Sequence, residues 1–355
     1  MKIHLLLFFL FFNGSTYCIA QKIETINPES LYFKELKLTA QRTAPAEIKF
    51  PFSSIRIIDS RFDTSKIGFL PVDNIIQDKR NVFRKIRFKG GIVKPLQKYY
   101  NDYYKNSFKQ NGFELLIVMK RFWVSGVDYT RDKRIVLTNS LEATTNLYCK
   151  WEYYLGKDGH YLPVKRLDTI MQVNDEIAQF IDEEFDERRL GKFKFLLKAM
   201  IELNDFEKKA EMFDRLPNKT IEEILNFNAK RNELIVLKDS AFKKGIYLSF
   251  EEFKNNKPSI VDYKEEKTRY KIFKAERYLT DSQGNLINNY WGYSDGEIFR
   301  YGKYGNDRIF RVGNTFEFFV QINNAEANNS TPVTTRDKIK VWFPYQIDME
   351  TGNIY

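Results

Sequence analysis

The stretch "LEATTNLYCKWEYYLGKDGHYLPVKRLDTIMQV", residues 141–173, decides the fold of the first half of this chain. Two strand-like runs, 141–155 and 160–173, flank the turn sequence "GKDG", which is typical of a β-hairpin. Alternate positions of the first run are mostly apolar, so this strand is expected to bury one face. Cys149 lies on that face, and we interpret it as a buried thiol; a reactive nucleophile is the alternative.

Further strand and helix patterns surround this hairpin. The run 53–62 reads as a strand, and 113–126 reads as a buried strand that follows a helical pattern in 93–112. From Asp175 to about Phe213 the pattern is again helical, and its start is acidic. Acidic residues at a helix start complement the helix dipole, so we expect a solvated helix face there. A carboxylate-bound cation is the alternative, but the acids are spread around the helix.

The second half of the chain is rich in strand-like runs separated by turns. Turn sequences such as "SQGN", "SDG" and "GN" recur at spacings of about ten residues, which predicts an antiparallel meander. A last strand pair is expected across the turn 349–352, between 338–348 and 353–355.

Two helix starts in the chain carry a capping-box pattern. Thr220 and Glu223 stand three residues apart, and so do Ser249 and Glu252. Glu251 is adjacent to Glu252 and therefore points about 100° away from it on a helix. We interpret the two adjacent carboxylates as parts of a helix start and not as an acid/base pair.

These patterns predict an α+β fold. An N-terminal α/β sandwich-like domain, with a mixed sheet and long helices, is expected to precede a β-rich antiparallel meander domain. The expected divisions are a signal peptide at 1–20, a lead-in segment at 21–50, an α/β domain at 51–215, a helical linker at 216–242 and a β-rich domain at 243–355.

Residues 1–21 have the features of an export signal. Lys2 precedes an apolar run that is too short to span a membrane, and small residues in 18–20 suit cleavage after Ala20. Lipid anchoring at Cys18 is the alternative, although the residues before it match a lipoprotein signal poorly. We expect an exported protein of the periplasm or cell surface, with no transmembrane helix after signal removal.

Scarce cysteine and histidine limit the chemistry of the chain. Of two cysteines and two histidines, only Cys149 and His160 lie beyond the expected signal. This count excludes an internal disulfide, a cysteine zinc site and a multi-histidine metal site in the mature chain. His160 lies beside a glycine in a turn, so we expect a solvated side chain. We predict no metal and no cofactor, since the chain also has no glycine-rich phosphate loop.

The charge of the chain bears on its partners. The formal net charge is +10, but 47 acidic residues are mixed among the basic ones. Dispersed charge and an export signal argue against nucleic acid as a partner. An anionic envelope surface is the more natural electrostatic partner.

Two groups of side chains are candidates for binding. The densest basic patch, for an anionic lipid or glycan surface, consists of Lys79, Arg80, Arg84, Lys85, Arg87 and Lys89. A solvated strand edge or loop is the structural alternative. A glycan platform could form from Trp291, Tyr293, Tyr301 and Tyr304. Here the alternative is a β-domain core, because aromatic residues are abundant throughout the chain.

Three motifs of the C-terminal half carry a resemblance. They are "GIY-x-x-FEEF-x-NN-x-P" at 245–258, "WGYSDG" at 291–296 and "DMETGNIY" at 348–355. With them this half resembles exported proteins of unknown function from Gram-negative bacteria, which have no established activity. The N-terminal half is similar to envelope auxiliary lipoproteins, including those that accompany ABC transporters, in its order of "SIRIIDSRFD", "IGF", a helix, "NGFELLIV", a hairpin and a long helix.

The sequence therefore favours an exported, non-catalytic envelope protein that acts as a binding or accessory subunit. Its expected partner is an envelope protein or an anionic envelope surface. Glycan binding by the aromatic β domain is the first alternative. A carboxylate-based hydrolase is the second; such an enzyme needs two acids about 5 to 10 Å apart across a cleft, and the sequence does not identify such a pair.

Overall fold

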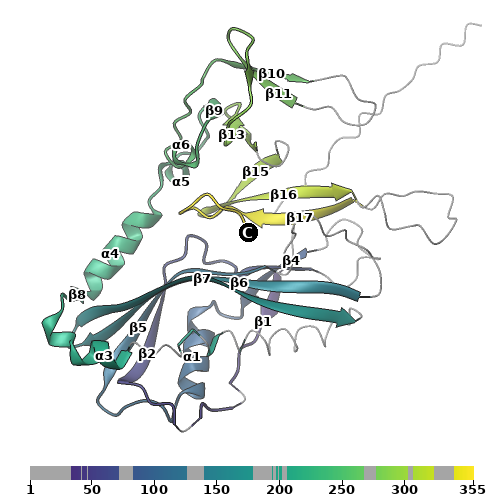
Figure 1. The fold of residues 1–355 in the computed structure, drawn as a ribbon. Helices are drawn as coiled ribbons and strands as arrows, with labels where there is room; N and C mark the ends of the chain where they lie inside the picture. Colours follow the sequence, from purple (N-terminus) through teal and green to yellow (C-terminus); the bar gives the residue numbers. More distant parts are fainter. Residues whose placement is uncertain are drawn as a thin grey trace, which may run out of the picture.

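The computed structural model describes residues 33–40, 42–45, 47–71, 83–125, 140–178, 194, 197–198, 200–201, 206–267, 277–302, 307–323 and 340–355. These residues form a strand-rich α/β structure with three sheets (Figure 1). In the described part of the chain, no helix is long and apolar enough to cross a membrane.

The N-terminal sheet is mixed, as the sequence predicts. Its strands run in the order β1-β4-β3-β5-β6-β7-β8, and β2 also pairs with β5. The pairs β1/β4, β2/β5 and β3/β5 are parallel, and the other pairs are antiparallel. The strand bounds are β1 Phe33–Leu36, β2 Phe52–Asp59, β3 Gly68–Pro71, β4 Phe83–Phe88, β5 Phe113–Ser125, β6 Ser140–Lys157, β7 His160–Ala178 and β8 Lys219–Thr220.

The predicted hairpin is the β6/β7 pair. Its strands are paired from Lys157↔His160 to Ser140↔Ala178, with a shift of register between Tyr153 and Tyr154. Asp158 and Gly159 form the turn with φ angles of 52° and 79°. Two positive φ angles match the tight turn that suits the twist of paired strands, which explains the Asp-Gly sequence. His160 is exposed beside this turn, as expected.

One face of this sheet forms the main apolar core. On β6 the buried side chains alternate from Leu147 to Leu155, and Cys149 is among them. Helix α1 (Val93–Tyr103) packs on this face through Leu96 and its tyrosines. The hydroxyls of Tyr99, Tyr100 and Tyr104 donate to the carbonyls of Lys194, Leu197 and Lys198, at 3.2, 3.0 and 3.2 Å.

The sequence predicts a helix from Asp175, but the first residues of that prediction are part of a strand. Residues 175–178 belong to β7, because they pair with 140–143 of β6 and the long hairpin overrides local helical preference. Residues 179–193, with most of the acidic run, lie outside the described residues. Helix α3 covers Phe206–Glu211, and a short 3-10 helix, η2, covers Phe213–Arg215.

The C-terminal sheet is an antiparallel meander, as predicted. Its order is β17-β16-β15-β14-β13-β9, so consecutive strands from β13 to β17 are neighbours. The bounds are β9 Gly245–Tyr247, β13 Gly292–Ser294, β14 Phe299–Tyr301, β15 Asp307–Val312, β16 Thr315–Asn323 and β17 Lys340–Gln346. A small sheet joins β10 (Tyr263–Lys267), β11 (Arg277–Asp281) and β12 (Leu286–Ile287). The expected last strand pair is present as a bridge between Ile347 and Ile354.

Short helices connect the two large sheets. Helix α4 (Ile221–Asn232) has the predicted capping box between Thr220 and Glu223, and α5 (Ile235–Lys238) follows it. Helix α6 (Phe250–Lys254) is capped by Ser249, whose hydroxyl accepts from the amide of Glu252. In a capping box the carboxylate of Glu252 would accept from the amide of Ser249, but here it accepts from the amide of Leu248.

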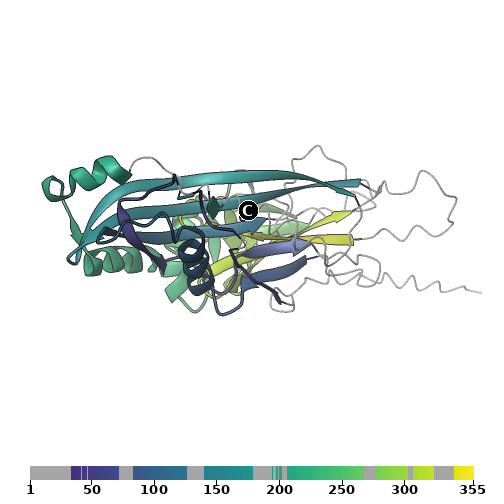
Figure 2. The same ribbon diagram turned by 90° about the horizontal axis from the view of Figure 1, so that it is seen from below.

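The N-terminal sheet lies between α1 and the C-terminal sheet. Figure 1 shows α1 below strands β5–β7 and strands β16 and β17 above them, and α1 is in front of these strands when seen from below (Figure 2). The apolar face of the N-terminal sheet is therefore turned toward α1. Its opposite face, in the region of β5 and β6, is turned toward the C-terminal sheet.

Candidate functional site

The predicted basic patch is divided in the structure. Lys79 and Arg80 lie outside the described residues. On β4 and just after it, Arg84 is half-buried, while Arg87 and Lys89 are exposed. Lys85 is only 6% exposed, and its ammonium lies 5.3 Å from the ring centroid of Phe33. Lys85 is therefore covered although it shares a face of β4 with Arg87, which lies over the same Phe33 ring, and Arg84, Arg87 and Lys89 remain as a basic edge.

The predicted aromatic platform is also divided. Trp291 and Tyr301 pack together in the core of the C-terminal sheet, with ring centroids 5.1 Å apart. Tyr293 is on the other face of the sheet, where it packs with Ile246 and Leu279. Tyr293 and Tyr301 are 1% and 4% exposed, so these rings do not form one accessible platform. Tyr304 lies outside the described residues.

The motif at 245–258 has a structural role around Asn256. The side-chain oxygen of this buried residue accepts from the Tyr247 hydroxyl at 2.7 Å and from the Lys243 amide at 2.9 Å. Its side-chain nitrogen donates to Asp239 and to the carbonyl of Ala241. Through these hydrogen bonds the motif holds α6 and β9 against the segment that follows α5.

The charged side chains that do converge are those on the second face of β5 and β6. A β-bulge leaves the backbone of Lys120 without a pairing position on β6, because Met119 pairs with Trp151 and Arg121 pairs with Lys150. Lys120 and Arg121 therefore both line the space toward the C-terminal sheet. Lys120 donates to Glu152 at 2.5 Å.

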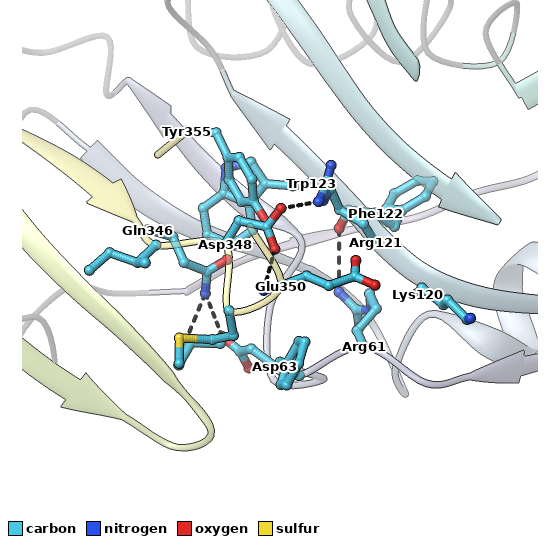
Figure 3. Close-up of a pocket in the computed structure, with 14 residues that line it drawn as sticks. Arg61, Asp63, Lys120, Arg121, Phe122, Trp123, Gln346, Asp348, Glu350 and Tyr355 are labelled. Carbon is cyan, nitrogen blue, oxygen red and sulfur yellow. Dashed lines mark hydrogen bonds and ion pairs between the residues drawn. The ribbon is translucent and has the colours of Figure 1, made fainter. Parts of the chain in front are cut away.

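Ion pairs connect this face to the turn after β17. Arg121 pairs with Asp348 (Figure 3). Lys150 pairs with Glu350. Asp168 of β7 adds a second, more exposed carboxylate, 3.5 Å from Arg121 and 3.4 Å from Lys150. The "DMETGNIY" motif thus supplies the two acids that hold it against the N-terminal sheet.

The loop between β2 and β3 makes a third connection. Lys66 forms ion pairs with Asp63 of the same loop and with Glu317 of β16. The side chains of Lys66 and Glu317 are fully buried. We call the three pairs Lys66–Glu317, Arg121–Asp348 and Lys150–Glu350 the clasp, because each one joins the two sheets.

Burial and charge change the pKa values in this cluster. Burial raises the pKa of the Glu317 carboxyl above its ordinary value, although Lys66 opposes the shift. Burial alone would lower the pKa of Lys66, but the Glu317 and Asp63 carboxylates outweigh it and raise the pKa. Burial also acts to raise the pKa of Asp63, but the attraction of Lys66 lowers it overall. The lysine therefore stays charged between its two partners.

A small pocket lies inside this junction. Its volume is about 30 Å³, and it is lined by Arg61, Phe62, Asp63, Lys120, Arg121, Phe122, Trp123, Thr315, Gln346, Ile347, Asp348, Met349, Glu350 and Tyr355 (Figure 3). A space of this size holds roughly one water molecule. The charged groups around it mostly contact one another, and the pocket is too small for a substrate.

A larger cavity of about 330 Å³ opens on the other side of the β2–β3 loop. Its walls come from that loop, from β1 and β4, and from the Gly-Gly turn before α1. They are Glu35, Arg61, Thr64, Ser65, Lys66, Ile67, Arg87, Phe88, Gly90, Gly91 and Ile92. Of the described residues of the predicted basic patch, Arg87 alone is among them. The volume is at the lower end of the range for small-ligand sites.

No protein-family model matches this chain. No curated protein sequence matches it either.

Sequence reasoning missed most residues of this region, but two local signals were present. The apolar run "LLIVMKRFWV" is interrupted by Lys120 and Arg121, and Glu317 stands among apolar residues in "TFEFFV". Charges inside such runs are unfavourable unless they are paired, so each interruption indicates a partner. The sequence does not say which partner.

Proposed function

We propose that this chain is an exported, non-catalytic binding or accessory protein of the cell envelope. The export features of residues 1–21 support the location. The acidic residues at the junction of the two sheets are paired with basic residues: Asp348 pairs with Arg121, and Glu350 pairs with Lys150. This pairing supports a non-catalytic role. We also propose that 51–215 and 243–355 act as two domains, which is supported by their separate apolar clusters and the ion pairs between them.

The basic edge is the observation that carries a binding role. Arg87 is exposed and lies 4.4 Å from the ring centroid of Phe33, which is itself 39% exposed at the edge strand β1. Lys89 follows on the same exposed turn. Arg87 also pairs with Glu35, whose side chain is 41% exposed. An aromatic ring beside exposed cations suits the boundary between an anionic surface and water.

The test compares two sets of three substitutions. Arg84→Ser, Arg87→Ser and Lys89→Ser remove the basic edge, and Lys98→Ser, Lys105→Ser and Lys109→Ser remove three exposed charges in and after α1. Each basic residue near an anionic surface contributes about 1 kcal/mol, so the first set should weaken vesicle binding more than about tenfold. Sedimentation with vesicles of phosphatidylglycerol and phosphatidylcholine measures the change.

The control set should keep most of the binding. Equal loss in both sets would show that only net charge matters, and unchanged binding in the first set would remove the proposed role of this edge. Crosslinking in cells, followed by separation of membrane and soluble envelope fractions, tests the location. A partner protein recovered in constant ratio would favour the accessory role.

A further inference from the structure

We propose that the outer edge of strand β7, which faces away from β6, pairs with the same edge of a second copy of this chain. The two strands are antiparallel, so the N-terminal sheets of both copies join into one continuous sheet. A two-fold axis passes beside Ile170, and each copy contributes the same residues to the interface. Pairing of two copies depends neither on the proposed envelope location nor on the ligand of the basic edge.

Strand β7 has a long edge without a neighbour. On one side it pairs with β6 from His160 to Ala178, but on the other side β8 pairs only with His160 and Tyr161. No other described strand pairs with β7. In Figure 2, β7 runs along the margin of the N-terminal sheet. Between 162 and 178 the outward backbone groups therefore have no strand partner in the described part of the chain, and such groups are a template for another strand.

Several edge strands elsewhere are protected in ways that β7 lacks. β1 has only four residues, and β9 has three and is covered by a bridge between Ile246 and Ile260. β17 carries Pro344, which has no amide hydrogen to donate. In β7 the only proline is Pro163, near its start, and no lysine or proline follows Arg166. The second half of this edge therefore stays open to a partner strand.

Ile170 lies at the middle of the open edge. Its side chain is 59% exposed, on the face of β7 that also carries the exposed Arg166 and Asp168. In an antiparallel pair centred on Ile170, the two copies of this side chain lie opposite each other, with Cβ atoms about 4.5–5.5 Å apart. Dimer formation thus covers a large apolar side chain that is open to water in the single chain.

The sequence of β7 matches itself in this register. Two residues that are equally distant from Ile170, one before it and one after it, lie opposite each other across the axis. Opposite charges then face each other, and leucine faces valine, which are favourable cross-strand pairs. Between 165 and 175 the facing positions are Lys165 with Asp175, Arg166 with Asn174, Leu167 with Val173, Asp168 with Gln172 and Thr169 with Met171.

Neighbouring registers match less well. Centring the pair on the residue before Ile170 places Asp168 opposite Ile170, and centring it on the residue after places Leu167 opposite Asp175. In both cases a charged residue faces an apolar one. The register centred on Ile170 is therefore the favoured one.

Lys165 and Asp175 cannot form their pair within one copy. Both belong to β7, and at about 3.3 Å per residue they lie about 33 Å apart along the strand. Any interaction between the two side chains must therefore cross from one copy to the other.

Sedimentation velocity over a range of protein concentrations tests the pairing. The unsubstituted chain should show a monomer–dimer equilibrium. Ile170→Lys places two like charges opposite each other on the axis, so it should raise the dissociation constant of the dimer by about tenfold or more. Val261→Lys is the matched control, because Val261 is 58% exposed and lies outside β7, and it should leave the constant unchanged.

An exchange of charges tests the register. Lys165→Glu should weaken the dimer by about tenfold, because two attractive pairs per dimer become repulsive. Adding Asp175→Lys makes both pairs attractive again with their signs exchanged. The double variant should therefore dimerise about as tightly as the unsubstituted chain.

Crosslinking tests the position of the axis. Directly opposite residues of paired antiparallel strands have Cα atoms about 4.5–5.5 Å apart, which is within the range of a disulfide. Ile170→Cys should therefore give a covalent dimer on mild oxidation, whereas Cys149 is buried and does not compete. Val261→Cys has the same native cysteines and should give no more covalent dimer than the unsubstituted chain on non-reducing electrophoresis.

Several results would overturn the inference. They are a chain that stays monomeric at its highest soluble concentration, equal dissociation constants for Ile170→Lys and Val261→Lys, no rescue in the charge-exchanged double variant, or no disulfide in Ile170→Cys. Circular dichroism establishes that each variant folds, and if Ile170→Lys does not fold, the charge exchange and the crosslink decide the question. A chain that dimerises but does not bind vesicles rejects the role of the basic edge and leaves the pairing of β7 intact.

Discussion

At the scale of single residues, the buried Lys66–Glu317 pair is the most consequential contact. Both side chains are fully buried, and they belong to a loop of one sheet and a strand of the other. Removing one member of a buried pair leaves an uncompensated charge. We expect Lys66→Met to lower the free energy of unfolding by about 3–5 kcal/mol at pH 7, as measured by urea denaturation.

The same pair predicts a pH dependence. A buried carboxyl with a raised pKa keeps its proton in the folded state after the unfolded state has lost it, so Glu317 destabilises the fold as pH rises above its ordinary value of 4.5. The loss of unfolding free energy caused by Lys66→Met should therefore become smaller as the pH is lowered toward 5. The double variant Lys66→Met with Glu317→Leu should recover most of the loss. Two results would contradict this explanation: a loss of unfolding free energy that does not change with pH, or a double variant that is no more stable than Lys66→Met alone.

Some residue environments follow from the sequence and others do not. Alternation along β6 places Cys149 correctly on the apolar face, where burial raises the pKa of its thiol. Lys66 carries no comparable signal, because its local sequence "DTSKIGF" reads as an exposed loop. Its burial depends on Glu317, and that pairing exists only in three dimensions.

At the scale of elements, the two adjacent glutamates of α6 have different tasks. Glu252 accepts hydrogen bonds from the Leu248 amide at 2.8 Å and from the Ser259 amide and hydroxyl at 3.2 and 2.8 Å. Glu251 is on the exposed side and pairs with Lys254 and Asn255, its near neighbours along the helix. The carboxylate of Glu252 thus ties the helix start to the chain that follows the helix.

We expect Glu252→Ala to lower the free energy of unfolding by about 2 kcal/mol, because hydrogen bonds to a charged acceptor are lost. Glu251→Ala is the matched control, and its effect should stay within about 0.5 kcal/mol, as is usual for exposed positions. Chemical denaturation of both variants measures the difference. Equal effects of the two substitutions would show that the hydrogen bonds of Glu252 do not stabilise the fold.

Helices, strands and turns were predictable where the local sequence pattern and the pairing in the folded protein favour the same structure. The β6/β7 turn and the cap of α4 were expected from their residues, since Asp-Gly and Thr-x-x-Glu act over a few positions. The end of β7 was not, because residues 175–178 have a helical local pattern and are drawn into the strand by β6. A long paired strand outweighs weak local preference.

At the scale of the whole molecule, the clasp decides how firmly the two large sheets hold together. Asp348→Asn with Glu350→Gln removes two of its three carboxylates. Amide hydrogen exchange in 340–355 should then become about tenfold faster, while β5 should keep its protection. Lys98→Ser breaks an exposed pair within α1 and serves as the control. Unchanged exchange in 340–355 would show that apolar contacts, such as those of Phe62 and Tyr355, hold the sheets without these charges.

The architecture of the molecule was predictable in outline and its junction was not. Periodicity indicated a mixed sheet followed by an antiparallel meander, and both are present. The relation between the sheets depends on the bulge at Lys120, which turns one extra charge toward the second sheet. No periodic pattern reports such a bulge, so the charged face of β5 and β6 became visible only in the structure.

The contact between Asp63 and Gln346 joins positions 283 residues apart in the sequence. The β2–β3 loop cannot reach its final place until almost the entire chain is available, and such distant contacts slow folding. A chain of this kind spends a long interval with strand edges uncovered, and during that interval it is vulnerable to aggregation and proteolysis. The time at which the two sheets close on each other, as well as the strength of their contact, is therefore set by these distant contacts.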